Sequence, residues 1–348
     1  MNPRHRRLLI PGLLIALLVI VVLSSLSRRA DGAELPSADV AAARGVVVSR
    51  MTDPRITESS GLVVSTADPD IVYTINDSGN APVVFVVRLS TGAVIGTTAV
   101  GGGTPRDIES MAIDPEGTLW VADTGDNENS RKDAALYSMP QPGTGDRSVV
   151  ARRYPVDYDA GPQNVEALVI DPATGRKLLV SKEVFAGAVF ELPDDLSTQG
   201  TNTAKGVGDE VAGLITDGAF TADGAQVVLR NYSTAYVYQA SSWSLVRDET
   251  MPDSKQGETL AMEPSGTSFL VGSEGADSPL VRVPFDEPAV ATPTPSATAT
   301  PSGTPSTPQP VNDGLLPQGN GFAGATWFWA AAVMGLLAVI TVAATRRS

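Results

Sequence analysis

Residues 44–286 repeat one pattern of apolar and polar positions five times. Each repeat opens with a carboxylate and a short apolar run, passes through a turn rich in Asp, Pro and Gly, and continues into a second and a third apolar run. Short apolar runs joined by glycine-containing turns are typical of paired β-strands. The opening carboxylates are Glu58, Glu109, Glu166, Asp217 and Glu258, which are 51, 57, 51 and 41 residues apart. This period predicts an all-β fold, a β-propeller of five blades.

The two ends of the repeat region predict how the ring closes. The fifth repeat lacks an outer strand after Pro284, and an unassigned apolar run, Gly45 to Arg50, precedes the first repeat. We expect this N-terminal strand to complete the last blade, because the closure removes two exposed strand edges. The alternative is a ring of six blades, with a degenerate blade in residues 140–165 or 193–212. A β-sandwich is less consistent with the repeated unit.

Both ends of the chain carry apolar segments. Residues 1–29 contain a basic run and the apolar stretch Leu8 to Leu26, the pattern of a signal peptide or a signal anchor helix. Residues 325–345 are uncharged and precede a basic tail at 346–348, which predicts a transmembrane helix in the lipid bilayer with a cytoplasmic tail. We therefore expect a protein of the cell membrane, with the propeller outside.

Residues 287–324 are expected to form a stalk. Within them, residues 291–310 contain six Pro, six Thr and three Ser, a composition that favours extended chain over a packed core. The order of stalk, Leu316-Pro317-Gln318-Gly319, apolar segment and arginines resembles a sortase tail. Because Gly319 stands where that motif has threonine, we favour a retained transmembrane anchor.

Composition excludes several kinds of chemistry from the repeat region. The chain has no cysteine, and its one histidine is His5. Disulfides, cysteine-ligated metals and histidine bases are therefore absent from residues 44–286. The same region contains 18 basic and 34 acidic residues, a balance that repels nucleic acid phosphates and attracts cations.

The repeated carboxylates predict a cation site. The first strand of each propeller blade lines the central channel, so the five opening carboxylates are expected to lie near one another. Several carboxylates around one axis cannot all stay ionised without compensation. Ca²⁺ accepts six to eight oxygen ligands with loose geometry, and Mg²⁺ is the lesser choice because it needs a strict octahedron. The alternative is that each carboxylate caps a neighbouring loop.

A second group of polar residues follows the second strands. It comprises Asp77, Asp123, Asp126, Glu183, Arg230 and Glu274, and we expect it to form a ring at the opposite mouth of the channel. The segment Asp123 to Asn129 places oxygens at alternate positions, as in the first half of a calcium loop, although an Asx-turn explains it nearly as well. The candidate metal ligands are therefore Glu58, Asp77, Glu109, Asp123, Asp126, Glu166, Asp217 and Glu258.

The string from Asp107 to Asp123, DIESMAIDPEGTLWVAD, resembles the blade signature of bacterial exported propellers of the phytase-like (esterase-like) and gluconolactonase-type superfamilies. The segments ESSG from Glu58 and NDSG from Asn76 add to this resemblance. The resemblance implies a divalent cation, usually calcium, held by channel carboxylates, and hydrolysis of phosphoesters or lactones in some members. The chain departs from a phytase in its basic residues, because only Arg131, Lys182 and Arg230 are expected at channel-facing loops.

Two functions follow as hypotheses. The first is a binding or scaffolding module on a stalk, stabilised by a cation, that presents its loops to an extracellular protein, glycan or small ligand. The second is a metal-dependent hydrolase of the esterase, phosphoesterase or lactonase kind. In that case Glu109 or Glu166 is the general base, and Arg230 stabilises the developing anion.

Overall fold

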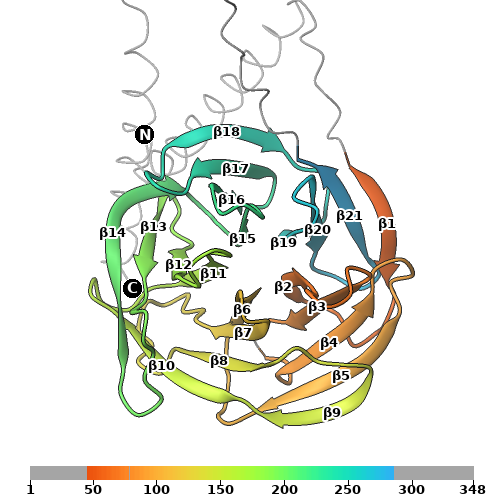
Figure 1. Cartoon of the computed structure of the whole chain (residues 1–348), viewed down its shortest axis with the longest axis horizontal. Helices are drawn as coiled ribbons and strands as arrows, with labels where there is room; N and C mark the ends of the chain where they lie inside the picture. Colours follow the sequence, from red (N-terminus) through yellow and green to blue (C-terminus); the bar gives the residue numbers. More distant parts are fainter. Residues whose placement is uncertain (1–44, 78, 286–348) are drawn as a thin grey trace, which may run out of the picture. The chain divides into compact units, whose positions relative to one another are not determined.

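The computed structural model describes residues 45–77 and 79–285 of the 348-residue chain. These residues form β-strands, turns and loops, and the described ranges contain no helix. The strands lie in five units around a central axis (Figure 1), and the innermost strands are β2 (Ser59–Val64), β6 (Ile108–Ile113), β11 (Val165–Ile170), β15 (Asp217–Phe220) and β19 (Gly257–Met262). The prediction of an all-β, propeller-like fold is confirmed.

Each unit is a four-stranded antiparallel sheet that runs outward from its innermost strand. The second strands are β3 (Ile71–Asn76), β7 (Thr118–Asp123), β12 (Lys177–Ser181), β16 (Gln226–Arg230) and β20 (Ser268–Ser273). The third strands are β4 (Val83–Arg88), β8 (Ala135–Pro140), β13 (Ala186–Glu191), β17 (Thr234–Gln239) and β21 (Ser278–Pro284). The outer strands are β5 (Val94–Gly101), β10 (Arg152–Tyr158), β14 (Asn202–Ala212), β18 (Leu245–Thr250) and β1 (Val46–Met51).

The ring closes where the sequence predicts it. Strand β1 pairs antiparallel with β21, with Val46 opposite Arg282 and Met51 opposite Ser278. The first strand of the described chain thus completes the sheet formed by the last three, and the edge of β21 is covered. The described residues between 46 and 284 therefore form a ring that closes on itself.

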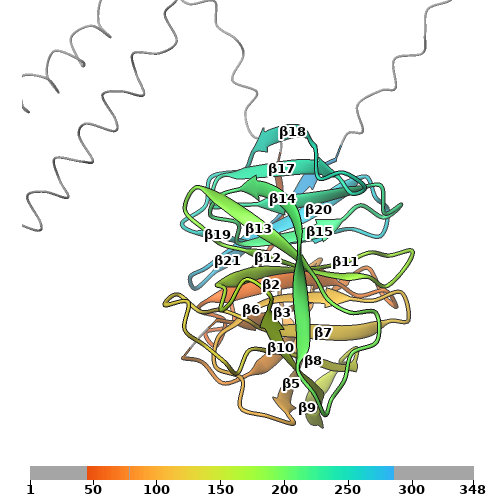
Figure 2. The same cartoon turned by 90° about the vertical axis from the view of Figure 1, so that its left-hand side faces the viewer.

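Neighbouring units are also joined at the outside of the ring. Strand β9 (Gly145–Val150) leaves the second unit and pairs parallel with β5 of the first. Strand β14 of the third unit pairs parallel with β10 of the second, and Figure 2 shows β14 crossing between the two units. Residues 140–165 and 193–212 thus contribute outer strands to the five units, and in the described residues they do not form a sixth.

The hydrophobic core lies between the sheets. Five clusters of buried side chains each join two neighbouring units, and together they run around the whole ring. Leu168 of β11 packs towards the second unit, whereas the next residue, Val169, packs towards the fourth. This alternation follows from the two-residue period of a strand. The described residues therefore contain a complete hydrophobic core, and every strand of the five sheets comes from these residues.

In the second unit, the turn between the first and second strands depends on an aspartate and a glycine. In the second unit, Asp114 accepts hydrogen bonds from the backbone N–H of Thr118 (2.7 Å) and from Nε1 of Trp120 (2.8 Å). Gly117 has a φ of 81°, a conformation that a side chain disfavours. The turns between first and second strands place one end of each innermost strand at the same mouth of the channel.

The membrane-related predictions fall on other parts of the chain. Residues 1–29, 287–324, 325–345 and 346–348 lie outside the described residues, so their assignment stays a prediction. Between residues 45 and 285, no helix is long and apolar enough to cross a membrane.

Candidate functional site

Three of the repeated carboxylates occupy the same position in their units. The pairing of β6 with β7 shifts between Ile108 and Ser110, and this places Glu109 in a β-bulge. The same shift occurs around Glu166 in β11 and around Glu258 in β19. A bulge re-aims the side chain of the extra residue. All three glutamates are buried, with 3–4% of their surface exposed.

The other two repeated carboxylates, Glu58 and Asp217, occupy different positions in their units, so the five carboxylates do not form one equivalent set. Counted back from the turn after the innermost strand, Ser60 and Thr216 occupy the positions equivalent to Glu109. Glu58 is exposed two residues before that position. Asp217 is fully buried one residue after it. The sequence alignment on the first carboxylate of each repeat therefore shifted these two units out of register.

The predicted opposite ring is also wrong. In an antiparallel hairpin the end of the second strand lies beside the start of the first, and Ile108 is paired with Asp123. Likewise, the backbone N–H of Asp77 donates to the carbonyl of Glu58 (2.9 Å). The residues after the second strands therefore lie at the same mouth as the glutamates, which we call the acidic mouth.

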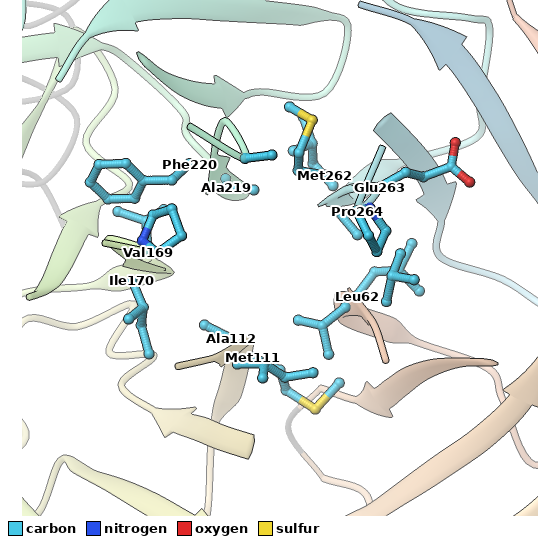
Figure 3. Close-up of a pocket in the computed structure, with 18 of the residues that line it drawn as sticks. Leu62, Met111, Ala112, Val169, Ile170, Ala219, Phe220, Met262, Glu263 and Pro264 are labelled. Carbon is cyan, nitrogen blue, oxygen red and sulfur yellow. The ribbon is translucent and has the colours of Figure 1, made fainter. Parts of the chain in front are cut away.

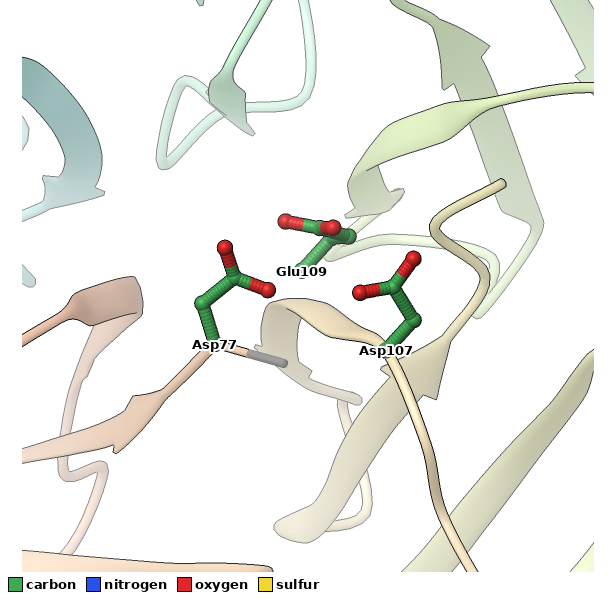
Figure 4. Close-up of side chains that lie close together, drawn as sticks. All are labelled: Asp77, Asp107 and Glu109. Carbon is green, nitrogen blue, oxygen red and sulfur yellow. The ribbon is translucent and has the colours of Figure 1, made fainter. Parts of the chain in front are cut away.

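Asp77, Asp107 and Glu109 form a cluster of carboxylates at the acidic mouth. One oxygen from each lies within 4.8 Å of the others, and Figure 4 shows the three carboxylates around a common space. Asp77 follows β3, whereas Asp107 and Glu109 come from the start of β6. Two neighbouring units thus supply one group of ligands, and we call this group the acidic triad.

The backbone of Gly125 closes one side of the acidic triad. Its N–H donates to the carbonyl of Asp107 (3.1 Å). A Cβ at this position would lie 2.6 Å from Oδ2 of Asp107 and would collide with Oε1 of Glu109. Only glycine leaves room for both carboxylates in this arrangement.

Burial and mutual repulsion raise the pKa values of four glutamates at the acidic mouth. The pKa of Glu109 lies well above its ordinary value because the group is buried and because Glu166, Asp77 and Asp107 repel its charge. Burial raises the pKa of Glu166 to about 7. Burial also raises the pKa of Glu258, and of Glu274 near the same mouth. The mouth therefore favours the arrival of positive charge.

Lys182 supplies positive charge on one side of this mouth. Its Nζ lies 2.8 Å from Oε2 of Glu166 and 5.2 Å from the ring centroid of Tyr232. Burial alone would lower the pKa of Lys182, but the charges of Glu166 and Glu258 raise it above its ordinary value. Nδ2 of Asn164 donates to the other oxygen of Glu166 (3.0 Å). Glu166 is thus held by an ammonium and an amide.

Asp123 and Asp126 hold the loop that surrounds the acidic triad. Oδ1 of Asp123 accepts hydrogen bonds from the backbone N–H of Asp107 (3.0 Å) and from the guanidinium of Arg131 (2.8 Å). Oδ2 of Asp126 accepts from the backbone N–H of Arg131 (2.7 Å). These contacts give both aspartates a positioning role beside the triad, and their role as metal ligands stays a prediction.

Arg230 is buried between the fourth and fifth units. Its guanidinium donates to the backbone carbonyls of Asn231 (3.1 Å), Tyr232 (3.3 Å), Thr259 (3.0 Å) and Gly272 (3.3 Å). Burial lowers the pKa of Arg230 to about 10. In this arrangement the guanidinium joins two sheets, and its donors point at backbone oxygens.

Asp217 links its innermost strand to two others. Its Oδ1 lies 3.0 Å from Oγ of Ser110 on β6, and its Oδ2 accepts from the backbone N–H of Leu260 on β19 (2.8 Å). Oγ of Ser110 in turn accepts from the backbone N–H of Leu168 on β11 (3.0 Å). Four of the five innermost strands meet in this network, which we call the channel partition.

Asp107 and Ser110 are site residues that the sequence pattern did not predict. Asp107 stands seven residues before Asp114, and Glu58 stands seven residues before Ser65, the residue equivalent to Asp114 in the first unit. An alignment of the repeats on their turns therefore places Asp107 and Glu58 at one position, seven residues before the turn. It places Glu109, Glu166 and Glu258 at another position, two residues later. Ser110 carries no comparable signal, because its partner Asp217 is 107 residues away.

Comparisons with known proteins identify no family for this chain. No family model matches the chain, and no curated protein matches it. Among solved structures, a luciferin-regenerating enzyme aligns with a TM-score of 0.41 and 10% sequence identity, over 65% of this chain and 78% of that chain. The fold is therefore assigned from the strand pairing described above, and the resemblance to phytase-like and gluconolactonase-type propellers stays a prediction.

Proposed function

We propose that this protein is a five-bladed propeller that is held at the cell surface and binds a partner or ligand through its acidic mouth, with Ca²⁺ in the acidic triad. The observation that carries the proposal is the convergence of Asp77, Asp107 and Glu109 at one point. The apolar segments at 1–29 and 325–345 and the stalk at 287–324 support the placement at the membrane.

The acidic triad fits a hard cation. Ca²⁺ binds oxygen ligands at roughly 2.4 Å, so two ligand atoms on one ion lie at most about 4.8 Å apart. The three oxygens of the triad satisfy this limit. The donor set consists of carboxylates, which calcium and magnesium prefer. A bound dication would also offset the repulsion that raises the pKa of Glu109.

The loop after β12 supports a binding role for the same mouth. It carries Lys182 and continues into Val184 and Phe185, whose exposed fractions are 66% and 85%. Exposed large apolar side chains are common where a protein meets a partner. An aromatic loop beside a charged mouth suits a partner or ligand with both apolar and charged groups.

Calcium titration of the full chain tests the cation site. Isothermal titration calorimetry is expected to show one tight calcium site that is lost in Glu109→Gln. Glu116→Gln is the matched control, since Glu116 lies in an exposed turn after the innermost strand. Equal calcium affinity in both variants would remove the acidic triad from the proposal.

A metal-dependent hydrolase is the second candidate, and one observation favours it. The pKa of Glu166, raised to about 7 by burial, suits a general base near neutral pH. In this candidate the cation would polarise the substrate and activate a water molecule. A panel of lactones, esters and phosphoesters tests it. Turnover that requires calcium and is lost in Glu166→Gln would favour the hydrolase, whereas no turnover would leave the binding module.

A further inference from the structure

The two ends of the channel differ in chemistry. At the turn end, Figure 3 shows a hollow of about 260 Å³ beside Leu62, Met111 and Met262. Among the described residues, the innermost strands border it with edges that pair with no other strand. Its lining contains one carboxylate, Glu263, which is paired with Arg282 through two contacts of 2.7 Å each. The side chains that could organise a cation site therefore lie at the other end, in the loops of the acidic mouth.

The loop that follows β7 turns back on itself beside the acidic triad. Asn129 has a φ of 49°, in the left-handed region that asparagine enters more readily than most residues. Its backbone N–H donates to the carbonyl of Asp126 (2.8 Å). The backbone N–H of Arg131 then donates to Oδ2 of Asp126 (2.7 Å). This reversal of the chain brings the side chain of Arg131 back onto the start of its own loop, at Asp123 and Gly125.

The guanidinium of Arg131 reaches three partners at once. Nη1 donates to the carbonyl of Gly125 (2.6 Å), and Nη2 donates to Oδ1 of Asp123 (2.8 Å). Nε lies 3.1 Å from Oδ1 of Asp133. The side chains of Arg131 and Asp123 are only 9% and 2% exposed, so loss of the arginine would leave a buried carboxylate without its cation. We call the contacts of Arg131 with Gly125 and Asp123 the arginine clamp.

Both partners in the arginine clamp contact the acidic triad. Oδ1 of Asp123 accepts from the backbone N–H of Asp107 (3.0 Å), and the N–H of Gly125 donates to the carbonyl of Asp107 (3.1 Å). The close approach of Gly125 to Oε1 of Glu109 leaves no room for a Cβ. The place of Gly125 therefore sets the space that is open to the carboxylates of Asp107 and Glu109.

We propose that Arg131 is a positioning residue for the acidic triad. Through the arginine clamp it fixes the backbone that holds Asp107 and that borders Glu109. Groups that orient metal ligands from behind typically change metal affinity about 10–100-fold when they are mutated. The inference deepens the proposed function and rests on it, because calcium is the ion that we propose for the triad.

The charge and the position of Arg131 have opposite effects on calcium affinity. Loss of a nearby positive charge should by itself tighten calcium binding, whereas loss of the clamp should weaken it. We expect Arg131→Met to weaken calcium binding at least about tenfold in isothermal titration calorimetry of the full chain. Arg131→Lys keeps the charge, but a single ammonium does not reproduce the fork of donors, so it should also weaken binding. Full affinity in Arg131→Lys would overturn the proposal.

Arg106→Met is the matched control. Nη1 of Arg106 lies 3.1 Å from Oδ2 of Asp133, and the side chain of Arg106 is 63% exposed. Within the described residues its guanidinium donates only to Asp133, and its backbone N–H is kept in the variant. The variant thus removes the same charge from the same group of residues and leaves the arginine clamp intact. Its calcium affinity should equal or slightly exceed that of the unmodified protein.

Hydrogen exchange of the EDTA-treated full chain tests the clamp without calcium. The backbone amides of Asp107 and Gly125 should exchange at least about tenfold faster in Arg131→Met, and at an unchanged rate in Arg106→Met. Amides of β12 should stay protected in both variants, which shows that the ring is folded. If Arg131→Met does not fold, Arg131→Lys takes its place, since it keeps a cation beside the buried Asp123.

The two measurements together decide the proposal. Faster exchange and weaker calcium binding in the Arg131 variants alone would support it. Unchanged exchange at Asp107 and Gly125, or calcium binding by Arg131→Met as tight as by Arg106→Met, would each overturn it. If the unmodified protein binds no calcium, the proposed function fails, and the exchange rates still show whether Arg131 holds the acidic triad.

Discussion

Asp217 in the channel partition gives the fold a specific dependence on pH. This carboxyl is fully buried, and burial raises its pKa to about 8 from the 3.8 of an exposed aspartate. A neutral Asp217 is therefore the favoured form in the folded state at neutral pH. Asparagine has the same shape and remains neutral at every pH. Asp217→Asn should keep the contacts to Ser110 and Leu260 and remove the titration.

The size of the effect follows from the two pKa values. Because the folded-state pKa is raised, the stability from this group is complete below pH 4 and declines as the pH rises towards 8. Each pH unit inside this window costs about 1.4 kcal/mol. Between pH 5 and pH 7 the unmodified protein should lose about 3 kcal/mol that the Asp217→Asn variant keeps.

Urea denaturation of EDTA-treated protein at pH 5, 6 and 7 measures this difference. The buried glutamates also titrate, but they are common to both proteins and cancel when the free energies of unfolding are subtracted. The matched control is Asp157→Asn, since Asp157 is exposed and its variant should follow the unmodified protein at each pH. A difference between Asp217→Asn and the unmodified protein that stays constant from pH 5 to pH 7 would refute the reasoning.

Three other substitutions test the remaining parts of the structure. Arg230→Met removes a buried cation that donates to four backbone carbonyls, and it should lower the free energy of unfolding by about 3–5 kcal/mol in urea titrations. A loss below about 1 kcal/mol would contradict a stabilising role for these contacts. Lys182→Met removes a positive charge near the acidic triad and should tighten calcium binding about tenfold, as measured by calorimetry. An unchanged calcium affinity would show that the charge of Lys182 does not act on the acidic triad. Gly125→Ala should displace Asp107 and Glu109 and weaken calcium binding, whereas Gly143→Ala, with its nearest neighbour atom at 3.6 Å, should leave it intact.

The organisation of the ring was accessible from the sequence because it is periodic. Each repeat of carboxylate, apolar run, turn and apolar run corresponds to one unit, and the unassigned strand before the first repeat pairs with the last unit. The outer pairings of β9 with β5 and of β14 with β10 were not accessible in the same way. They are parallel contacts between units, and no local pattern of turn residues marks them.

The site was only partly accessible. Glu109, Glu166 and Glu258 share one position, because each lies at the bulge of its innermost strand. Glu58 and Asp217 carry the same kind of side chain at other positions, and residue type alone does not reveal a shift of one or two residues. Arg230 reads as a channel-facing cation in the sequence, but its length allows it to reach backbone carbonyls of the next unit.

The proposed binding of calcium at the acidic mouth is tested most directly by a thermal melt of residues 45–285. The protein is treated with EDTA and then melted alone, with calcium and with magnesium. Binding to the folded state at about 100 times the dissociation constant should raise the melting temperature by roughly 5–10 °C. We expect this rise with calcium, a smaller rise with magnesium, and loss of both rises in Glu109→Gln. A melting temperature that stays unchanged with both calcium and magnesium would contradict the proposed cation site.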